Sequence, residues 1–480
     1  MWKNVVLTPG NGKKGMSENY LQELQTIVGS EGFIGSEESI DPFLQERRGL
    51  YRGHCSAVIR PGSTEEVAEV VKCCKRHSVS ITPQSGNTGL CGGAVPQGGI
   101  IISMGRMNRI RNFDPVNSSI TAESGCIQID LQTAAREREL MMTLSCPAQK
   151  ECQLGGNLST NLGGLNVLRY GNTRDLVLGL EVVLPSGEIW HGLRGLRKDN
   201  AGYDLKHLFI GAEGTLGIIT AATLKLFPFP KTRLTAMVAM AEIDELMDVF
   251  IGTRERFADN LVGFEIIPRI AVEMVLQYDD KILEPFPARH NWYGLIELNA
   301  TNQGLDLKTP MTDFLRNLSC DSRIAENESE SDALWAIRHA IPEAQKIKGA
   351  SIKHDVSLPI NKMSTFLTEA AKQVKERLPG ILVCSFGHAG DGNVHFNLTQ
   401  PEEMDAQEFN NLHHEFNRIV HDLVHLMNGS IAAEHGVGQL KHEELRKYTD
   451  PVEYEMMRMI KRTFDPQNLF NPGKVIKLDE

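Results

Sequence analysis

Three glycine-rich segments in the first half of the chain constrain its fold more than any other feature. They are "PQSGNTGLCGGAVPQGG" at residues 83–99, "QLGGNLSTNLGGLNVLRYGNTRD" at 153–175 and "GAEGTLGIIT" at 211–220. Glycine lets backbone N–H groups approach a bound anion without obstruction by side chains. One such loop is commonly just a turn, whereas three in one half of the chain indicate a phosphate-binding cradle.

The chain is organised into several structural units. A length of 480 residues exceeds what one hydrophobic core serves. Residues 55–86 read as strand, turn, helix capped at Ser63 and Thr64, and strand, and short β-like runs follow up to residue 231. Helices and strands alternate from residue 232 onward. The sequence therefore predicts an N-terminal extension (1–50), a glycine-rich domain (51–231), a second α+β domain (232–458) and a turn-rich tail (459–480) that packs back on the first domain; the "FPFPK" segment at 227–231 marks the boundary between the domains.

Bulk composition excludes several classes of protein. Fifty basic against 61 acidic residues give a formal charge of -11, which argues against a nucleic-acid binder. Nine scattered cysteines without a CxxC motif predict neither a disulfide framework nor a thiolate metal site. No segment approaches the roughly 18 apolar residues of a membrane span. We expect a cytoplasmic protein, for which a peripheral membrane contact and a homodimer stay open.

The N-terminal "PGNGKKG" at residues 9–15 matches GxGxxG, the fingerprint of a dinucleotide loop. We reject that interpretation because Pro9 interrupts the preceding strand and Ser17 supplies a helix N-cap shortly afterwards. Met16 is a possible alternative start, which leaves open whether residues 1–15 are native.

Histidines dominate the polar motifs of the second half. "FGHAGDGNVHFN" at 386–397 places His388 and His395 on either side of a turn, where they could bind a metal, move a proton or fill a strand. The segment "AAEHGVG" adds Glu434 and His435. Two histidines and one carboxylate leave an open position on a zinc-like ion, as a catalytic site requires.

A second histidine set is interpreted differently. His414, His421 and His425 share one face of a predicted helix, opposite an apolar stripe. We therefore predict that they form the solvated side of an amphipathic helix and not a metal site.

The order of the motifs carries a family resemblance. "PQSGNTGLCGGAVP", "GGNLSTNLGGLNVLRYG", "LRKDNAGYDLKHLFIGAEGTLGIIT", "FGHAGDGNVHFN", "AAEHGVGQLK" and "FNPGKV" follow one another as in the FAD-linked oxidases of the vanillyl-alcohol oxidase superfamily. The chain resembles the D-2-hydroxyglutarate dehydrogenases most, with the D-lactate dehydrogenases and the glycolate oxidase flavin subunit as neighbours. The resemblance covers residues 35–478 and implies an α+β protein: a two-subdomain FAD-binding domain of the PCMH type, a substrate domain with an antiparallel sheet, and a tail returning to the FAD domain.

The resemblance also implies an FAD site. Its residues are Pro83, Gln84, Ser85, Gly86, Asn87, Thr88, Gly89, Gly155, Gly156, Asn157, Ser159, Gly164, Gly214, Thr215, Gly217, Ile219 and Asn471. The first glycine-rich loop has no histidine, so we expect non-covalent FAD, with Cys91 as a small buried side chain.

The remaining site residues follow from the same resemblance. His388, His395 and Glu434 are expected to bind a divalent metal of the zinc type, and His435 to act as the catalytic base and contact substrate. Arg338, Lys353 and Asn397 are expected on the substrate carboxylates. One departure is Pro342, where some hydroxyglutarate dehydrogenases have a threonine that can donate a hydrogen bond.

The implied reaction is oxidation of a D-2-hydroxy acid to the 2-oxo acid, D-2-hydroxyglutarate to 2-oxoglutarate being the first choice, with hydride transfer to flavin N5. The electrons would leave through an electron-transfer flavoprotein or a quinone-linked acceptor. Because of Pro342, D-lactate, D-malate and glycolate stay open as substrates. A flavin-free zinc hydrolase is the alternative from another class.

Overall fold

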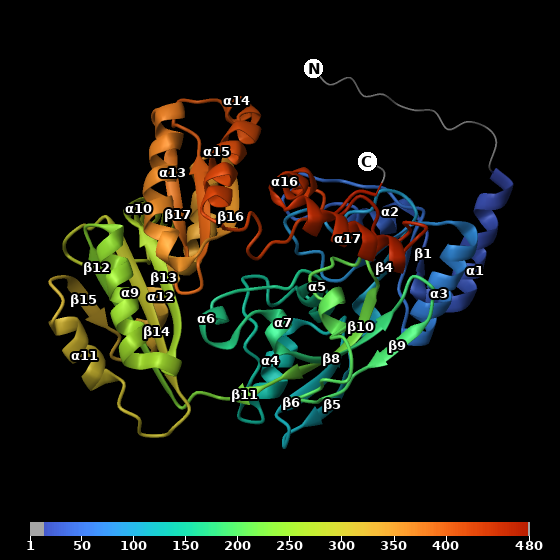
Figure 1. Ribbon diagram of the computed structural model, residues 1–480, viewed down its shortest axis with the longest axis horizontal. Coiled ribbons are helices and arrows are strands. Elements are labelled where there is room, and N and C mark those ends of the chain that lie inside the picture. Colours follow the sequence, from blue (N-terminus) through green and yellow to red (C-terminus); the bar gives the residue numbers. More distant parts are fainter. Residues whose placement is uncertain (1–13, 479–480) are drawn as a thin grey trace.

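The computed structural model describes residues 14–478 of the protein (Figure 1). Pro9 to Lys13, where most of the rejected dinucleotide motif falls, lie outside the described residues. Helix α1 (Lys14–Gly32) begins three residues before the predicted N-cap Ser17.

A four-stranded sheet with strand order β1-β2-β4-β3 opens the fold. Its strands are β1 (Phe33–Ile34), β2 (Ala57–Ile59), β3 (Ile81–Gln84) and β4 (Ile100–Ser103). Both β2 and β3 run parallel to β4, and helix α3 (Thr64–His77) connects β2 to β3. The predicted cap is confirmed, because Ser63 Oγ accepts a hydrogen bond of 3.2 Å from the backbone N–H of Glu66. Helices α1 and α3 pack together on one core with this sheet.

A five-stranded antiparallel sheet follows, with strand order β5-β6-β10-β8-β9. Its strands are β5 (Ile110–Asp114), β6 (Ser119–Glu123), β8 (Val177–Val183), β9 (Ile189–Gly192) and β10 (Ile218–Lys225). Every residue of β8 is buried, and its side chains are apolar except that of Glu181, whose carboxylate pairs with Arg111. The accompanying helices are α4 (Gln128–Arg136), α5 (Leu154–Ser159), α6 (Val167–Tyr170), α7 (Thr173–Leu176) and α8 (Lys206–Phe209). The prolines at 228 and 230 do not form a free linker, because β11 (Phe227–Pro228) pairs with β7 (Leu140–Met141).

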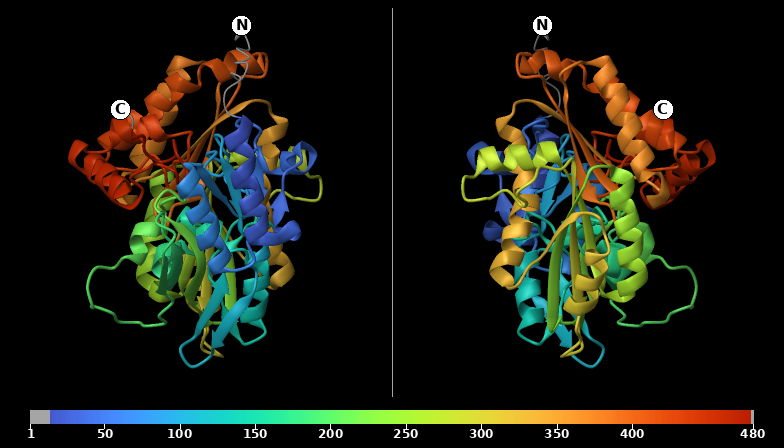
Figure 2. Two further views of the ribbon diagram at one scale, coloured as in Figure 1. Left: turned by 90° about the vertical axis from the view of Figure 1, so that its right-hand side faces the viewer. Right: turned by 90° about the vertical axis from the view of Figure 1, so that its left-hand side faces the viewer.

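The second half is built on a seven-stranded antiparallel sheet with strand order β15-β12-β14-β13-β17-β18-β16. Its strands are β12 (Thr232–Met240), β13 (Leu261–Pro268), β14 (Trp292–Ala300), β15 (Asp321–Ile324), β16 (Ser351–Ser357), β17 (Leu382–His388) and β18 (Asn393–Thr399). Its helices are α9 (Ile243–Phe257), α10 (Arg269–Tyr278), α11 (Lys308–Arg316), α12 (Glu328–Ile347), α13 (Met363–Arg377), α14 (Ala406–Asn411) and α15 (His413–Leu426). Figure 2 shows α1 and α3 on one side of the molecule and this sheet with its helices on the other.

The C-terminal segment returns to the first half, as predicted (Figure 1). After α16 (His442–Tyr448) and α17 (Pro451–Phe464), the backbone N–H of Ile81 donates to Leu469 O at 2.7 Å, and that of Asn471 donates to Ile81 O at 2.8 Å. Helix α17 runs through residue 459, where the tail was expected to begin. The remaining short helices are α2 (Glu37–Ile40) and the 3-10 turns Asp41–Phe43, Met104–Arg106, Ala258–Asn260 and Ile360–Lys362.

The predicted α+β class with an antiparallel sheet in the second half is confirmed. Within residues 14–478, no helix combines the length and apolar content that crossing a bilayer requires.

The prediction that three histidines of helix α15 face solvent is wrong for one of them, His421. His414 and His425 are exposed, but His421 is buried, with its ring 5.6 Å from that of His354 on β16. Burial lowers the pKa of His421 to about 2, so this side chain is a neutral part of the core. The apolar stripe and His421 together face the sheet, which makes the buried face of the helix wider than the stripe alone indicates.

Candidate active site

A hairpin carries the first two predicted metal ligands. Strand β17 ends at His388 and β18 begins at Asn393, and the four-residue turn between them brings the rings of His388 and His395 to 5.5 Å. Gly392 in this turn has φ +89°, and a Cβ there would lie 2.3 Å from the carbonyl oxygen of Leu358. The turn therefore requires glycine at this position.

Glu434 completes a three-ligand group with these histidines. Its Oε1 lies 3.4 Å from His388 Nε2, and its Oε2 lies 3.8 Å from His395 Nε2. Four ligands about 2.1 Å from a tetrahedral zinc ion are about 3.4 Å apart, so the spacing fits such an ion. The donor set, two imidazoles and a carboxylate, also fits it.

Two carboxylates missed at the sequence level orient the histidines from behind. His388 Nδ1 lies 2.5 Å from Glu265 Oε1 on β13, and His395 Nδ1 lies 3.6 Å from Asp355 Oδ1 on β16. A carboxylate on Nδ1 leaves Nε2 free to bind a metal, and such pairs are common around metal sites. Neither Glu265 nor Asp355 belongs to a motif in the sequence; only the strand pairing brings them here.

The site's electrostatics follow from these pairs. Burial alone would lower the pKa of His388, but Glu265 and Glu434 outweigh it and raise this pKa to about 9. Burial raises the pKa of Glu265, but His388 and Arg338 outweigh it and lower this pKa to about 2. For Glu434, burial raises the pKa to about 7. A buried carboxyl with so high a pKa is stabilised when a cation joins it.

His435 stands beside the three-ligand group and outside it. Its Nδ1 lies 3.3 Å from Asp355 Oδ2, and its ring stacks on that of His395 at 6.0 Å. The backbone N–H groups of Glu434 and His435 both donate to Asp355 Oδ2, at 2.8 and 2.9 Å. Burial lowers the pKa of His435. A neutral imidazole held through Nδ1 is equipped to accept a proton at Nε2.

Asp355 is the residue that holds the backbone of Glu434 and His435 in place. We expect Asp355→Ala to lower the free energy of unfolding by about 3 kcal/mol, because it leaves two partly buried N–H groups and the paired histidines without their buried acceptor. Urea denaturation followed by circular dichroism measures the change. Asp259→Ala, at an exposed position, is the matched control, and equal stability of both variants would contradict the assignment.

The predicted substrate cations lie on neighbouring elements. Arg338 on α12 is buried, its Nε donates to Glu265 Oε2 at 2.6 Å, and its guanidinium lies over the ring of Phe386. Lys353 on β16 pairs in register with Asn397 on β18, and no ion pair to Lys353 occurs within residues 14–478. Asn397 donates to Gln345 Oε1 at 2.9 Å. Arg338 thus has a carboxylate partner already, whereas Lys353 does not.

The first glycine-rich loop has the free donors that an anion needs. No backbone N–H from Gly86 to Ala94 donates a hydrogen bond to another described residue. Asn87 has φ +50°, and a Cβ on Gly86 would lie 2.3 Å from Glu151 O. Such a row of unpaired N–H groups forms a nest suited to a pyrophosphate. The loop therefore fits the FAD that the sequence implies.

The other predicted cofactor residues divide into two groups. Gln84, Asn157 and Ile219 are buried, and the first two bond to the protein's own groups: Gln84 donates to Phe43 O and Ala94 O, and Asn157 to Gln128 Oε1. Of the rest, Pro83 belongs to β3, Gly155, Gly156 and Ser159 belong to α5, and the loops carry Ser85, Thr88, Gly89, Gly164 and the buried Gly214, Thr215 and Gly217. Asn471, from the returning tail, donates to Gly93 O and Glu213 O and so holds two of the loops together.

Glu213, on the third glycine-rich segment, contacts the turn that follows His435. This buried carboxylate accepts backbone hydrogen bonds from Val437 at 2.7 Å and from Gly438 at 2.9 Å. Burial raises its pKa to about 7. The nearby Cys91 is also buried, which raises its pKa to about 11 and makes its thiol a poor nucleophile.

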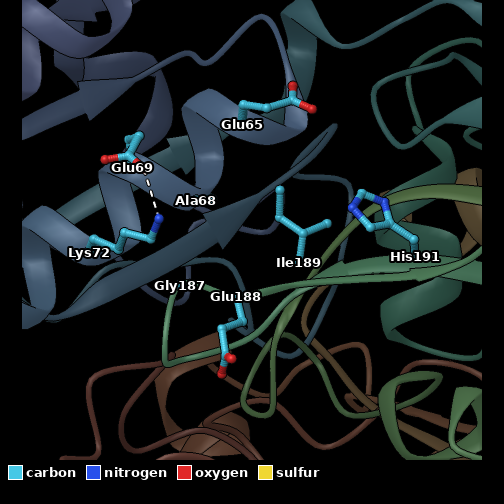
Figure 3. Close-up of a pocket in the computed structure, with 8 residues that line it drawn as sticks. All are labelled: Glu65, Ala68, Glu69, Lys72, Gly187, Glu188, Ile189 and His191. Atoms are coloured by element: carbon cyan, nitrogen blue, oxygen red, sulfur yellow. Dashed lines mark hydrogen bonds and ion pairs between the residues drawn. The ribbon is translucent and has the colours of Figure 1, made fainter.

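A surface pocket between α3 and β9 lies elsewhere (Figure 3). Three glutamates line it, and its lysine, Lys72, already pairs with Glu69 at 2.8 Å. Acidic walls do not suit an anionic substrate or cofactor, so we place no site there.

Comparisons with known proteins agree with both halves of this arrangement. Residues 229–475 match the family described as FAD linked oxidases, C-terminal domain, and residues 55–192 match the family described as FAD binding domain.

Full-length relatives are found in several organisms. The D-2-hydroxyglutarate–pyruvate transhydrogenase of Saccharomyces cerevisiae is 33% identical over 475 residues, covering 95% of this chain and 94% of the relative. The D-2-hydroxyglutarate dehydrogenase of Stutzerimonas stutzeri is 33% identical over 460 residues, covering 95% and 98%. The mitochondrial D-2-hydroxyglutarate dehydrogenase of Danio rerio is 35% identical over 434 residues, covering 88% and 79%.

Solved structures share the fold. The structure of p-cresol methylhydroxylase with substrate bound has a TM-score of 0.78 at 19% identity, covering 98% of this chain and 99% of that chain. The 4-ethylphenol oxidase from Gulosibacter chungangensis, in complex with isoeugenol, has a TM-score of 0.75 at 19% identity, covering 98% of each.

Proposed function

Because the chain belongs to the family of FAD-linked oxidases, we propose that it is a metal-assisted dehydrogenase that oxidises D-2-hydroxyglutarate to 2-oxoglutarate. The observation that carries this proposal is the group of His388, His395 and Glu434 with His435 beside it, which adjoins a loop of unpaired N–H groups through Glu213. The FAD-binding match argues against a flavin-free zinc hydrolase.

The glycine-rich loops would hold FAD without a covalent bond. The N–H groups of the 86–94 loop would bind its pyrophosphate, and a side chain at Gly86 would collide with the neighbouring backbone. When bound, FAD supplies the two-electron acceptor for the substrate's C2 hydride. The loop has no histidine, and the raised pKa of Cys91 disfavours a covalent link.

His388, His395 and Glu434 would hold a divalent cation of the zinc type. When bound, the cation supplies a positive charge that favours ionisation of a hydroxyl beside it. Glu265 and Asp355 would orient the two imidazoles for metal binding. Both contacts are present without substrate.

His435 would take the proton of the substrate 2-hydroxyl at Nε2. Its lowered pKa keeps the ring neutral and able to accept, and Asp355 stabilises the imidazolium that forms. Asp355 also fixes the backbone of residues 434 and 435, so the base and the third metal ligand are positioned by one carboxylate.

Lys353 and Asn397 would contact the substrate carboxylates. They face each other across the β16–β18 pair, and Lys353 has no ion pair within residues 14–478. Arg338 is bonded to Glu265, so it would attract the substrate carboxylates by its positive charge and not by a direct hydrogen bond from Nε. Similarity to relatives that act on D-2-hydroxyglutarate supports this substrate. Shorter acids are also candidates, because Pro342 on α12 cannot donate a hydrogen bond to a second carboxylate.

The test is a substrate panel on the purified protein. We expect an oxidised flavin absorbance band near 450 nm (roughly) that is bleached by D-2-hydroxyglutarate under anaerobic conditions. D-malate, D-lactate and glycolate are compared by kcat/KM with an artificial electron acceptor, and L-2-hydroxyglutarate controls for stereochemistry. Bleaching by D-lactate and not by the five-carbon acid would replace the proposed substrate; a colourless protein would overturn the flavin assignment.

A further inference from the structure

An arginine outside all the motifs has no acidic side-chain partner within residues 14–478. Arg48, in the segment between α2 and β2, donates from its guanidinium to the carbonyl oxygen of Leu90, and its Nε is buried without a hydrogen bond. No carboxylate lies within 4.0 Å of its side-chain nitrogens in the part of the chain that the structure describes. A partly buried guanidinium in this state is unfavourable unless an anion joins it.

The contacts of Arg48 connect it to the candidate active site through Leu90 and Cys91. Leu90, which it contacts, precedes Cys91, and the Cys91 carbonyl accepts backbone hydrogen bonds from Gln439 at 3.0 Å and from Leu440 at 3.3 Å. Cys91 Sγ also lies 3.4 Å from Gly436 O, directly after His435. Arg48 thus rests on the loop that touches the turn carrying the proposed base.

The electrostatics agree with this position. The positive charge of Arg48 contributes, after burial, to the lowered pKa of both His435 and Lys353. Arg48 belongs to the N-terminal half and contacts Leu90, while Lys353 lies on β16 of the seven-stranded sheet. Two cations that lack an ion pair within residues 14–478 and come from opposite halves of the chain are suited to a ligand with two negative groups.

Arg338 does not fill this role. Its Nε is committed to Glu265 at 2.6 Å, and this ion pair is buried. Four residues after Arg338, Pro342 has no N–H and no side-chain donor. Helix α12 therefore offers the second carboxylate of a substrate fewer hydrogen-bond donors than Arg48 does.

We propose that Arg48 binds the carboxylate remote from the reacting hydroxyl and so selects dicarboxylic over monocarboxylic 2-hydroxy acids. The inference rests on the proposed oxidation of a 2-hydroxy acid. It adds the residue that selects substrates by the length of their carbon chain. A guanidinium can hold a carboxylate through two parallel hydrogen bonds, which an ammonium cannot reproduce.

The test compares Arg48→Gln and Arg48→Lys with Arg47→Gln in the FAD-loaded enzyme. Arg47 is the adjacent, exposed arginine, whose partner Glu151 lies 3.5 Å away at the surface. For Arg48→Gln we expect the KM for D-2-hydroxyglutarate to rise on the order of 10²-fold, with the kcat/KM for D-lactate changed less than about threefold. Arg48→Lys should recover part of the loss, and Arg47→Gln should behave as wild type.

A binding measurement separates this inference from the proposed reaction. Glutarate has both carboxylates and no hydroxyl to oxidise, and its binding can be followed by perturbation of the flavin spectrum. Its dissociation constant should rise on the order of 10²-fold in Arg48→Gln. The dissociation constant of propionate should not change. Equal losses for D-lactate and the dicarboxylate, unchanged glutarate binding, or loss of FAD from the variant would each overturn the role of Arg48. If wild type binds glutarate through Arg48 but oxidises no 2-hydroxy acid, the proposed reaction fails and the dicarboxylate site stands.

Discussion

Replacing His435 by glutamine is expected to lower kcat on the order of 10²–10⁴-fold, because a general base contributes about that much to a proton transfer. The variant should keep its FAD, since the unpaired N–H groups proposed to hold the cofactor lie on the 86–94 loop and not at His435. Single-turnover bleaching of the flavin by D-2-hydroxyglutarate measures the chemical step directly, and the flavin-to-protein absorbance ratio measures cofactor content.

Two comparisons sharpen this result. His414→Gln removes an exposed histidine from α15 and should leave the rate unchanged. A role of His435 in folding alone would lower stability and flavin content together with the rate. Bleaching by His435→Gln at the wild-type rate would move the base to another residue.

Loss of the metal is expected to have an effect of similar size. Treatment with a chelator, or His395→Ala, should reduce bound divalent metal from one equivalent to a small fraction and lower kcat/KM at least about 10²-fold, because losing a residue that only orients a metal ligand already costs about 10–100-fold. Metal content by mass spectrometry is the direct readout. Zinc, manganese and cobalt added back to the chelated wild type identify the ion that restores activity.

The matched control for the metal is His421→Ala. This histidine is also buried in the second half, but it packs against His354 and lies outside the three-ligand group. It should lower stability while leaving metal content at the wild-type value. Equal metal in wild type and His395→Ala would refute the ligand assignment.

Short-range patterns in the sequence predicted the hairpin, the glycine-rich loops and the return of the C-terminal tail. The turn between His388 and His395 is local, so four turn-forming residues were enough to bring the rings together. Glu265 and Asp355 could not be predicted in this way, because each reaches the histidines through strand pairing across long stretches of chain. The helical spacing of α15 located its apolar stripe but not the buried His421, because periodicity does not show how wide a face the neighbouring strands cover.

Arg48 shows the same limit. Nothing in "ERRGLYRG" separates Arg48 from Arg47, yet one guanidinium rests on the loop at Leu90 and the other pairs at the surface. The difference arises from tertiary contacts and not from local sequence.

If His435 is the base, the hydrogen bonds from Val437 and Gly438 to Glu213 make its activity depend on both halves of the chain packing together. The proposed base sits on a turn whose backbone donors are satisfied by a residue more than two hundred positions earlier in the chain. The C-terminal half synthesised alone would carry every metal ligand but would lack the acceptor that shapes the turn. The proposed cofactor cradle and the proposed oxidising centre would therefore both be completed only after the C-terminal residues, Asn471 among them, have been synthesised and packed on the first half.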